Sequence, residues 1–323
     1  MKIKDLELKG NVILGPMAGV TNLAYRDFMK PFGVALSYSE MISDCGISYG
    51  NKRTYDYLET SDIDRPVGLQ LFGFDIKNTA KAIEIIQKEA TYDVLDINLG
   101  CPVPKVVKTG AGSAWLKDPE ALEKYMAEVC RLSEKPVTAK IRLGWDEDSI
   151  NFEEVALRLE KAGIAALAIH SRTRSQFYAG NASHELLRGL KEKLHIPLIV
   201  SGDVFSLEDA IKIKEITNCD AIMVARGGIG NPYLITQIDH YFKTGERLPN
   251  PSLADQLRYA REYRDKLIEF EGEERAVKEL RSILPHFLKG FAGYKKYRLA
   301  LTTVNRKEQI EAILRGIEVQ EGI

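Results

Sequence analysis

The chain has 323 residues, of which 45% are hydrophobic and 28% are charged, so a well-filled core is expected and wholesale disorder is excluded. The 45 basic and 46 acidic residues leave a net charge of −1, which by itself gives no reason to expect a polyanionic partner. The cysteines (Cys45, Cys101, Cys130 and Cys219) are widely spaced and form no C-x-x-C pair, so we expect a reduced, cytoplasmic protein without a metal site. Since no apolar run is long enough for a signal peptide or a membrane span, we also expect no membrane association. We expect the protein to be a monomer.

Short apolar runs rich in β-branched residues recur along the chain and predict eight strands. They lie at 12–14, 34–38, 67–72, 94–97, 137–141, 166–169, 198–200 and 221–224. Stretches with helical spacing separate them, including 77–89, 119–133, 152–162 and 207–217. Eight strand–helix units predict an α/β fold with a closed parallel barrel, the (β/α)8 TIM barrel. An open doubly wound sheet is the alternative, but the G-x-G-x-x-G turn that often opens such a sheet does not follow the first run.

The strand pattern stops after residue 244, where a stretch bearing Pro, Gly and Asn (245–251) leads into helical sequence from Leu253 to the end. We therefore predict a barrel domain at 1–244 and a small all-helical domain at 245–323. Within the second domain, residues 278–307 hold eight Lys or Arg against the single acid Glu279, a local net charge of +7. Aromatic residues are interleaved with these charges, namely Phe287, Phe291, Tyr294 and Tyr297. Such a segment is typical of a surface that contacts RNA, and a solvated helix face over an aromatic core is the alternative.

Almost all of the chemically unusual residues fall directly after a predicted strand. In a barrel these positions share the C-terminal face, where active sites are built and where the loops after strands seven and eight often hold a phosphate. The positions are 16–18, Gln70, 98–102, Lys140, 170–174, 201–203 and 225–228. Their placement predicts an enzyme.

Cys101 lies between glycine and proline at this face, within the segment DINLGCPVPKVVKTGAGSA. A loop thiol without a metal partner can act as a nucleophile or as a proton donor, according to its protonation state. Lys105, Lys108 and a glycine-rich turn follow it and predict a mobile loop that closes over a substrate. A structural cysteine is the alternative.

Lys140 lies near the end of an otherwise apolar strand, where an unpaired ammonium is unfavourable. We expect it to face an anionic or electron-rich ligand atom, with a salt bridge to a neighbouring strand as the alternative. His170 is followed by Arg172 and Arg174, a group suited to an anion or a ring edge. A hydrogen-bonded core histidine and solvent-facing loop arginines are the alternatives there.

Two short turns are candidates for a phosphate site, Ser201-Gly202-Asp203 and Arg226-Gly227-Gly228. Backbone amides, small residues and a guanidinium could there surround one phosphate, which favours a phosphorylated cofactor. Glycine-rich barrel turns also occur for steric reasons alone.

At these residues the chain resembles the tRNA-dihydrouridine synthase family, of the bacterial, FMN-dependent type. The resemblance spans nearly the whole chain, and it is carried by PMAGVTN at 16–22, Gln70, Asn98-Leu99-Gly100-Cys101-Pro102, Lys140-Ile141-Arg142, IHSRTR at 169–174, Gly202-Asp203 and ARGGIGNP at 225–232. Small departures stand at Ser171, Ser201 and Ala225, where many relatives carry glycine, asparagine and glycine.

The resemblance implies an enzyme that reduces uridines in tRNA to 5,6-dihydrouridine, with FMN as cofactor and NADPH as electron donor. Reduced flavin would deliver hydride to carbon 6 of the uracil, and Cys101 would donate a proton to carbon 5. The residues implied for FMN are Pro16, Met17, Ala18, Gln70, Lys140, His170, Ser201, Gly202, Asp203, Ala225 and Arg226. Asn98 and Arg172 would hold the uracil, and Lys295, Lys296 and Arg298 would contact the tRNA.

Two other functions fit part of the sequence. An FMN barrel that acts on a free pyrimidine or an enone would use the same phosphate turns and lysine, but the basic segment at 278–307 argues against it. A tRNA-binding or folding factor that has lost catalysis is the other, and the presence of Cys101 and Lys140 argues against that one.

Overall fold

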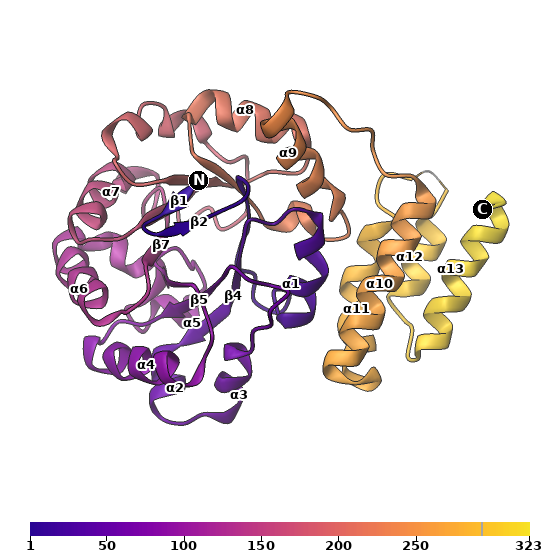
Figure 1. Ribbon diagram of the computed structural model, residues 1–323, viewed down its shortest axis with the longest axis horizontal. Helices are drawn as coiled ribbons and strands as arrows, with labels where there is room; N and C mark the ends of the chain where they lie inside the picture. Colours follow the sequence, from indigo (N-terminus) through magenta and orange to yellow (C-terminus); the bar gives the residue numbers. More distant parts are fainter. Residues whose placement is uncertain (292) are drawn as a thin grey trace.

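The computed structural model describes residues 1–291 and 293–323, and within them eight parallel strands form a closed barrel (Figure 1). The strands are β3 (Val12–Leu14), β4 (Leu36–Ser43), β5 (Val67–Phe72), β6 (Val94–Asn98), β7 (Val137–Arg142), β8 (Ala166–His170), β9 (Leu198–Ser201) and β10 (Ala221–Val224). Closure is made by β10, which pairs with β3 on one side and β9 on the other. The predicted (β/α)8 barrel is therefore confirmed, and only β4 departs from its expected range by more than two residues at an end.

The helices form an outer ring around the barrel (Figure 1). They are α1 (Leu23–Met29), α2 (Asp44–Ser48), α3 (Lys52–Tyr55), α4 (Ile76–Glu89), α5 (Pro104–Val107), α6 (Pro119–Leu132), α7 (Phe152–Lys161), α8 (Leu207–Thr217) and α9 (Tyr233–Thr244). Local chemistry fixes their starts: Asp118 caps α6 by accepting from the amide of Ala121, and Ser206 forms a capping box with Asp209 on α8. One apolar face of each long helix then packs on the strands.

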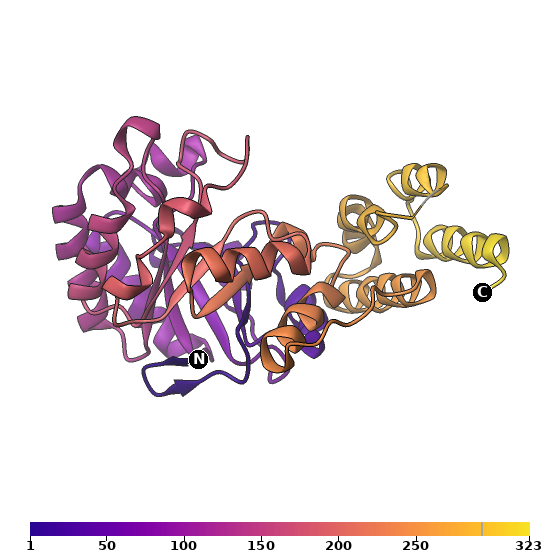
Figure 2. The same cartoon turned by 90° about the horizontal axis from the view of Figure 1, so that it is seen from above.

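Four further helices follow the barrel, as the sequence predicted, and extend from one side of it (Figures 1 and 2). They are α10 (Leu253–Glu271), α11 (Glu273–Phe287), α12 (Lys295–Leu301) and α13 (Lys307–Glu321). Aromatic rings join α10 to the barrel, since Tyr263 lies 5.6 Å from Tyr25 and 5.3 Å from Phe28 between ring centroids. The division at residue 244 remains a prediction.

An N-terminal hairpin, β1 (Lys2–Ile3) and β2 (Leu6–Glu7), was not foreseen from the sequence. Its Ile3 and the following Leu8 are buried in one apolar cluster with Ile13, Val94 and other residues of the barrel strands. The cluster fills the end of the barrel where the strands begin, so the opposite face is left for polar chemistry. Within the described residues, no helix combines the length and apolar character needed to cross a membrane.

Candidate functional site

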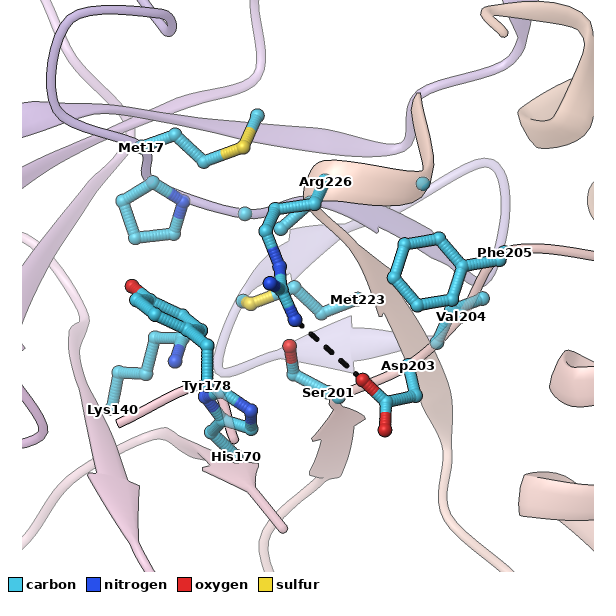
Figure 3. Close-up of a pocket in the computed structure, with 15 residues that line it drawn as sticks. Met17, Lys140, His170, Tyr178, Ser201, Asp203, Val204, Phe205, Met223 and Arg226 are labelled. Atoms are coloured by element: carbon cyan, nitrogen blue, oxygen red, sulfur yellow. Dashed lines mark ion pairs between the residues drawn. The ribbon is translucent and has the colours of Figure 1, made fainter. Parts of the chain in front are cut away.

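A cavity lies at the C-terminal mouth of the barrel (Figure 3). Loops and strand ends of β3, β7, β8, β9 and β10 line it. The predicted site residues among its lining are Pro16, Met17, Lys140, His170, Ser201, Gly202, Asp203, Ala225 and Arg226. Two residues predicted for the same site do not line it: Ala18 is exposed at the rim, and Gln70 is fully buried in the barrel.

Two tight turns form one side of this cavity. After β9, Gly202 and Asp203 both have left-handed backbone angles, with φ of 117° and 50°. After β10, Gly227 packs against the carbonyl of Val204 so closely that a Cβ atom there would overlap the carbonyl oxygen. The Arg226 guanidinium bends back over the first turn, 3.6 Å from the Asp203 carboxylate, and is 42% exposed (Figure 3). A cationic side chain over two glycine turns suits a phosphate group.

Lys140 supplies a positive charge to the opposite side of the cavity. The ion pairs at the mouth join Arg172 and Arg226 to Asp203, and Lys140 takes part in no ion pair found among the described residues. Burial, with the neighbouring Arg142, lowers the pKa of Lys140 to about 8, while the Asp96 carboxylate acts in the other direction. The ammonium can thus face a ligand atom, and the alternative, a salt bridge to a neighbouring strand, is not formed within the described structure.

His170 lies beside Lys140 at the end of β8 (Figure 3). Burial and the surrounding cations hold the pKa of His170 well below its ordinary value, so the ring is neutral at pH 7. Its Nε2 lies 3.3 Å from Nη1 of Arg172 and accepts that hydrogen bond, which leaves the proton on Nδ1. His170 can therefore donate from Nδ1 to a ligand acceptor.

The turn that carries Cys101 follows β6, the strand next to β7. Asn98 is in register with Lys140, and its side-chain oxygen accepts from the amides of Cys101 at 2.8 Å and Gly100 at 3.2 Å. The Cys101 side chain packs with Val106 and is 7% exposed. Burial raises the pKa of the Cys101 thiol, so the thiol stays protonated at neutral pH and is suited to donate a proton.

Arg172 and Arg142 hold the loops of the mouth. Arg172 is 2% exposed and donates to the carbonyls of Ala179 and Gly180, and to Asp203 at 2.7 Å. Arg142 donates to the carbonyls of Gly100, Thr173 and Phe177. Arg172, expected to hold a uracil, does not line the cavity, and its donors are engaged within the protein. Arg174 lies outside the cavity, its Cζ 4.3 Å from the centre of the Trp145 ring.

The structure adds two aromatic residues that the sequence pattern did not single out. Tyr178 lines the cavity, is 53% exposed, and lies 4.5 Å from the Cζ atom of Arg226 (Figure 3). Phe205 also lines it, and its ring lies 5.8 Å both from Arg226 and from the Lys289 ammonium on the C-terminal side. Their positions in the sequence could have identified them, since they follow β8 and β9 and the loops at this rim carry the functional residues of a barrel.

The basic segment separates into buried rings and exposed charges. Phe287 and Tyr294 belong to the main apolar core, and Phe291 and Tyr297 pack against it. On α12, Lys295, Lys296 and Arg298 are exposed, and none of them has a carboxylate partner within the described part of the chain. The aromatic residues therefore support a structural core, while the cations form a surface outside the cavity.

Comparison with known proteins gives a consistent result over the whole chain. A family model described as "Dihydrouridine synthase (Dus)" matches residues 13–321. A "Probable tRNA-dihydrouridine synthase" of Rickettsia bellii is 35% identical, covering 94% of this chain and 94% of that protein. A "tRNA-dihydrouridine synthase B" of Pseudomonas aeruginosa is 35% identical, covering 92% of this chain and 90% of that protein.

Among solved structures, an old yellow enzyme homologue from Zymomonas mobilis superposes with a TM-score of 0.54 at 12% identity. The match covers 79% of this chain and 94% of that one. At such low identity the likeness concerns the barrel fold alone.

Proposed function

The chain belongs to the dihydrouridine synthase family, and from this premise we propose that it reduces uridines in tRNA to 5,6-dihydrouridine with a bound FMN and with NADPH as electron donor. The observation that carries the proposal is the coincidence of a family match over residues 13–321 with a cavity at the barrel mouth lined by nine residues expected at a flavin site. The membership confirms the resemblance read from the motifs.

The lining of the cavity fits a flavin mononucleotide at both of its ends. The turns at Gly202 and Gly227, under the Arg226 guanidinium, would hold the phosphate. Lys140 and His170 would face the ring system, where a positive charge stabilises an anionic reduced flavin. When bound, FMN supplies hydride chemistry that no side chain of the protein can perform. Ala18 and Gln70 would contribute from outside the lining, Ala18 through the rim loop and Gln70 through the hydrogen bonds of its amide.

Cys101 would donate the proton that accompanies hydride transfer, placed on carbon 5 of the uracil while carbon 6 receives the hydride. The support is the raised pKa of its buried thiol, which keeps the proton in place until a substrate accepts it. Asn98 holds the Cys101 turn and would also contact the uracil. We propose that Arg172 acts on the substrate indirectly, by fixing the loop at Ala179–Gly180 and the Asp203 turn.

The substrate base must leave its stack to reach the barrel mouth, so the enzyme captures an unstacked nucleotide. The exposed cations of α12, Lys295, Lys296 and Arg298, would meanwhile bind tRNA phosphates. Phe205 lines the cavity, and its ring lies 5.8 Å from the Lys289 ammonium, so this pair would connect the cavity with the C-terminal helices.

The test is an absorbance spectrum of the purified protein, followed by anaerobic reduction with NADPH and addition of unmodified tRNA. We expect flavin bands that NADPH bleaches and tRNA restores, with dihydrouridine formed in the RNA. Reoxidation by a free pyrimidine or an enone but not by tRNA would replace the proposal with a small-molecule reductase. A protein that takes up no flavin on reconstitution but still binds tRNA would be a binding factor.

A further inference from the structure

A buried carboxylate lies in the barrel interior, outside the cavity. Asp96 on β6 is 1% exposed, and its neighbours in register are Gln70 on β5 and Thr138 on β7. Both donate to it at 2.6 Å, Gln70 from Nε2 to Oδ2 and Thr138 from Oγ1 to Oδ1. It has no ion-pair partner in the described residues. Burial of a charge that only neutral groups hold is unfavourable, so the presence of a carboxylate here calls for an explanation.

A single chain of hydrogen bonds leads from this carboxylate to the thiol turn. An ionised carboxylate only accepts, so Gln70 must turn its NH2 group toward Asp96 and its carbonyl away. That carbonyl accepts from Nδ2 of Asn98 at 2.8 Å. The Asn98 oxygen faces the Cys101 turn, where it accepts from the amides of Cys101 at 2.8 Å and Gly100 at 3.2 Å. The chain is therefore held by an acceptor at Asp96 and by two donors at the turn.

We propose that Asp96 is a positioning residue for the reaction: its carboxylate fixes the amide orientations of Gln70 and Asn98, and through them the position of Cys101. The inference rests on the proposed function, in which Asn98 and Cys101 meet the uracil and Gln70 supports the flavin. Asp96 is not among the residues that line the cavity, so its effect on Cys101 passes through the two amides, while its charge also acts on Lys140.

The surroundings of Asp96 support an ionised carboxylate at neutral pH. Burial raises the pKa of Asp96 to about 6, and the hydrogen bonds from Gln70 and Thr138 and the charge of Lys140 oppose that rise. The hydroxyl of Tyr38, 3.2 Å from Oγ1 of Thr138, donates to that oxygen, because the Thr138 proton is already used by Asp96. Every polar atom around the carboxylate is thus arranged for an acceptor.

The substitution Asp96→Asn changes almost nothing in shape but offers Gln70 either a donor or an acceptor, so only the hydrogen bond from Asn98 still orients the Gln70 amide. The double substitution Asp96→Asn with Gln70→Glu exchanges the two groups. The amide introduced at position 96 then donates to the carboxylate introduced at position 70, whose other oxygen still accepts from Asn98. Thr138→Val is the matched control, because it removes the two hydrogen bonds of the Thr138 hydroxyl, with Asp96 and Tyr38, and leaves the direction of the chain from Asp96 to Cys101 unchanged.

Two rates are measured on the flavin-loaded proteins. One is alkylation of Cys101 by iodoacetamide, followed by peptide mass spectrometry so that the other cysteines are counted separately. The other is reoxidation of the reduced flavin by tRNA in a single turnover, compared with flavin reduction by NADPH. For Asp96→Asn we expect alkylation to become about threefold faster and tRNA-dependent reoxidation to become about tenfold slower, because small displacements of reacting groups have large effects on rate. Reduction by NADPH should change less than reoxidation.

The double variant should return the alkylation rate toward that of the unsubstituted protein, and Thr138→Val should leave both rates near it. The inference is overturned if Asp96→Asn leaves both rates unchanged, if Thr138→Val has the same effect, or if the double variant gives no recovery. If Asp96→Asn does not fold, Gln70→Met interrupts the same chain of hydrogen bonds at its next member, and the same two rates are measured for it. Should tRNA fail to reoxidise even the unsubstituted protein, the proposed function fails, and the alkylation rates still decide the role of Asp96.

Discussion

At the scale of single residues, the burial of the Cys101 sulfur bears on the role proposed for this thiol. Because the thiol packs beside Val106 and its pKa is raised, little thiolate exists at neutral pH. Of the two chemical roles that the sequence left open, burial therefore favours proton donation over nucleophilic attack, and the proton-donor role stays a proposal. The amide of Asn98 holds the turn from the other side.

Replacing Cys101 by alanine should leave FMN and tRNA binding nearly intact and slow uracil reduction about 100-fold or more, because a positioned general acid commonly contributes that much. The measurement is reoxidation of the reduced flavin by tRNA in a single turnover. Cys130→Ala is the control, since that half-buried cysteine lies on α6, away from the mouth. An unchanged rate in the Cys101 variant would remove the proton-donor role.

The Lys140 ammonium should give the reaction an alkaline limit. Its pKa is lowered to about 8, so the side chain is charged below that pH and neutral above it. We expect the single-turnover rate to fall as the pH rises through about 8, ahead of any loss from Cys101, whose pKa is raised. Lys140→Arg should retain rate at higher pH, and Lys140→Ala should shift the flavin absorbance and reduction potential. Identical pH profiles of the rate for the unsubstituted protein and the Lys140→Arg variant would assign the alkaline limit to another group.

At the scale of elements, the two turns after β9 and β10 depend on a single glycine contact. A Cβ atom at Gly227 would overlap the carbonyl oxygen of Val204. Neither atom can move away unless the backbone of its own turn moves with it. At Gly228 the nearest atom to a Cβ would be Cε of Met29 at 3.3 Å, the end of a flexible side chain. The turns therefore tolerate a methyl group at one position and not at the next.

Gly227→Ala should lower stability by about 1–3 kcal/mol and weaken FMN binding, because relief of the overlap forces the two turns apart. Gly228→Ala should change both quantities much less. A fluorescence titration of the apoprotein with FMN and a denaturation curve for each variant provide the comparison. Equal FMN affinity in the two variants would show that these turns do not form the phosphate site.

The strand β4 shows where local pattern stops being informative. The apolar run predicts a strand at 34–38, whereas the strand extends to Ser43 and shifts register between Tyr38 and Met41. Ser39 and Glu40 in its middle are polar but buried. The Ser39 hydroxyl accepts from the amide of Gln70, and the Glu40 carboxylate accepts from the amide of Gly19. Those partners come from other parts of the chain, so no local window contains them.

At the scale of the molecule, the helices after residue 252 combine an internal core with an external charge. Tyr263 and Phe287 on these helices contact Phe28 of the barrel, which attaches the C-terminal helices to α1. The cations of α12 remain on the surface. A chain with a net charge of −1 can therefore still present a local basic surface to RNA.

Binding of tRNA should weaken steeply with salt, and the double variant Lys295→Ala with Lys296→Ala should reduce the slope of log K against log salt by up to about 2, roughly one unit for each phosphate that is no longer neutralised. FMN binding and NADPH reduction should be unaffected. Lys88→Ala is the control, an exposed lysine on α4 of the barrel. A slope that responds equally to both variants would place the RNA elsewhere on the molecule.

The sequence by itself determined the barrel strands apart from the range of β4, the long helices, the barrel and the rim positions of the candidate site, because periodicity and strand–loop order are local properties that one chain displays directly. It also carried the family, through ordered motifs over nearly its whole length. The tertiary structure alone decided which of those side chains have free donors: Lys140 does, whereas Arg172 is engaged by Asp203 and two carbonyls. It likewise placed Gln70, Asp96 and Asn98 in one hydrogen-bonded chain, because that chain depends on the register between strands, which only the closed barrel fixes.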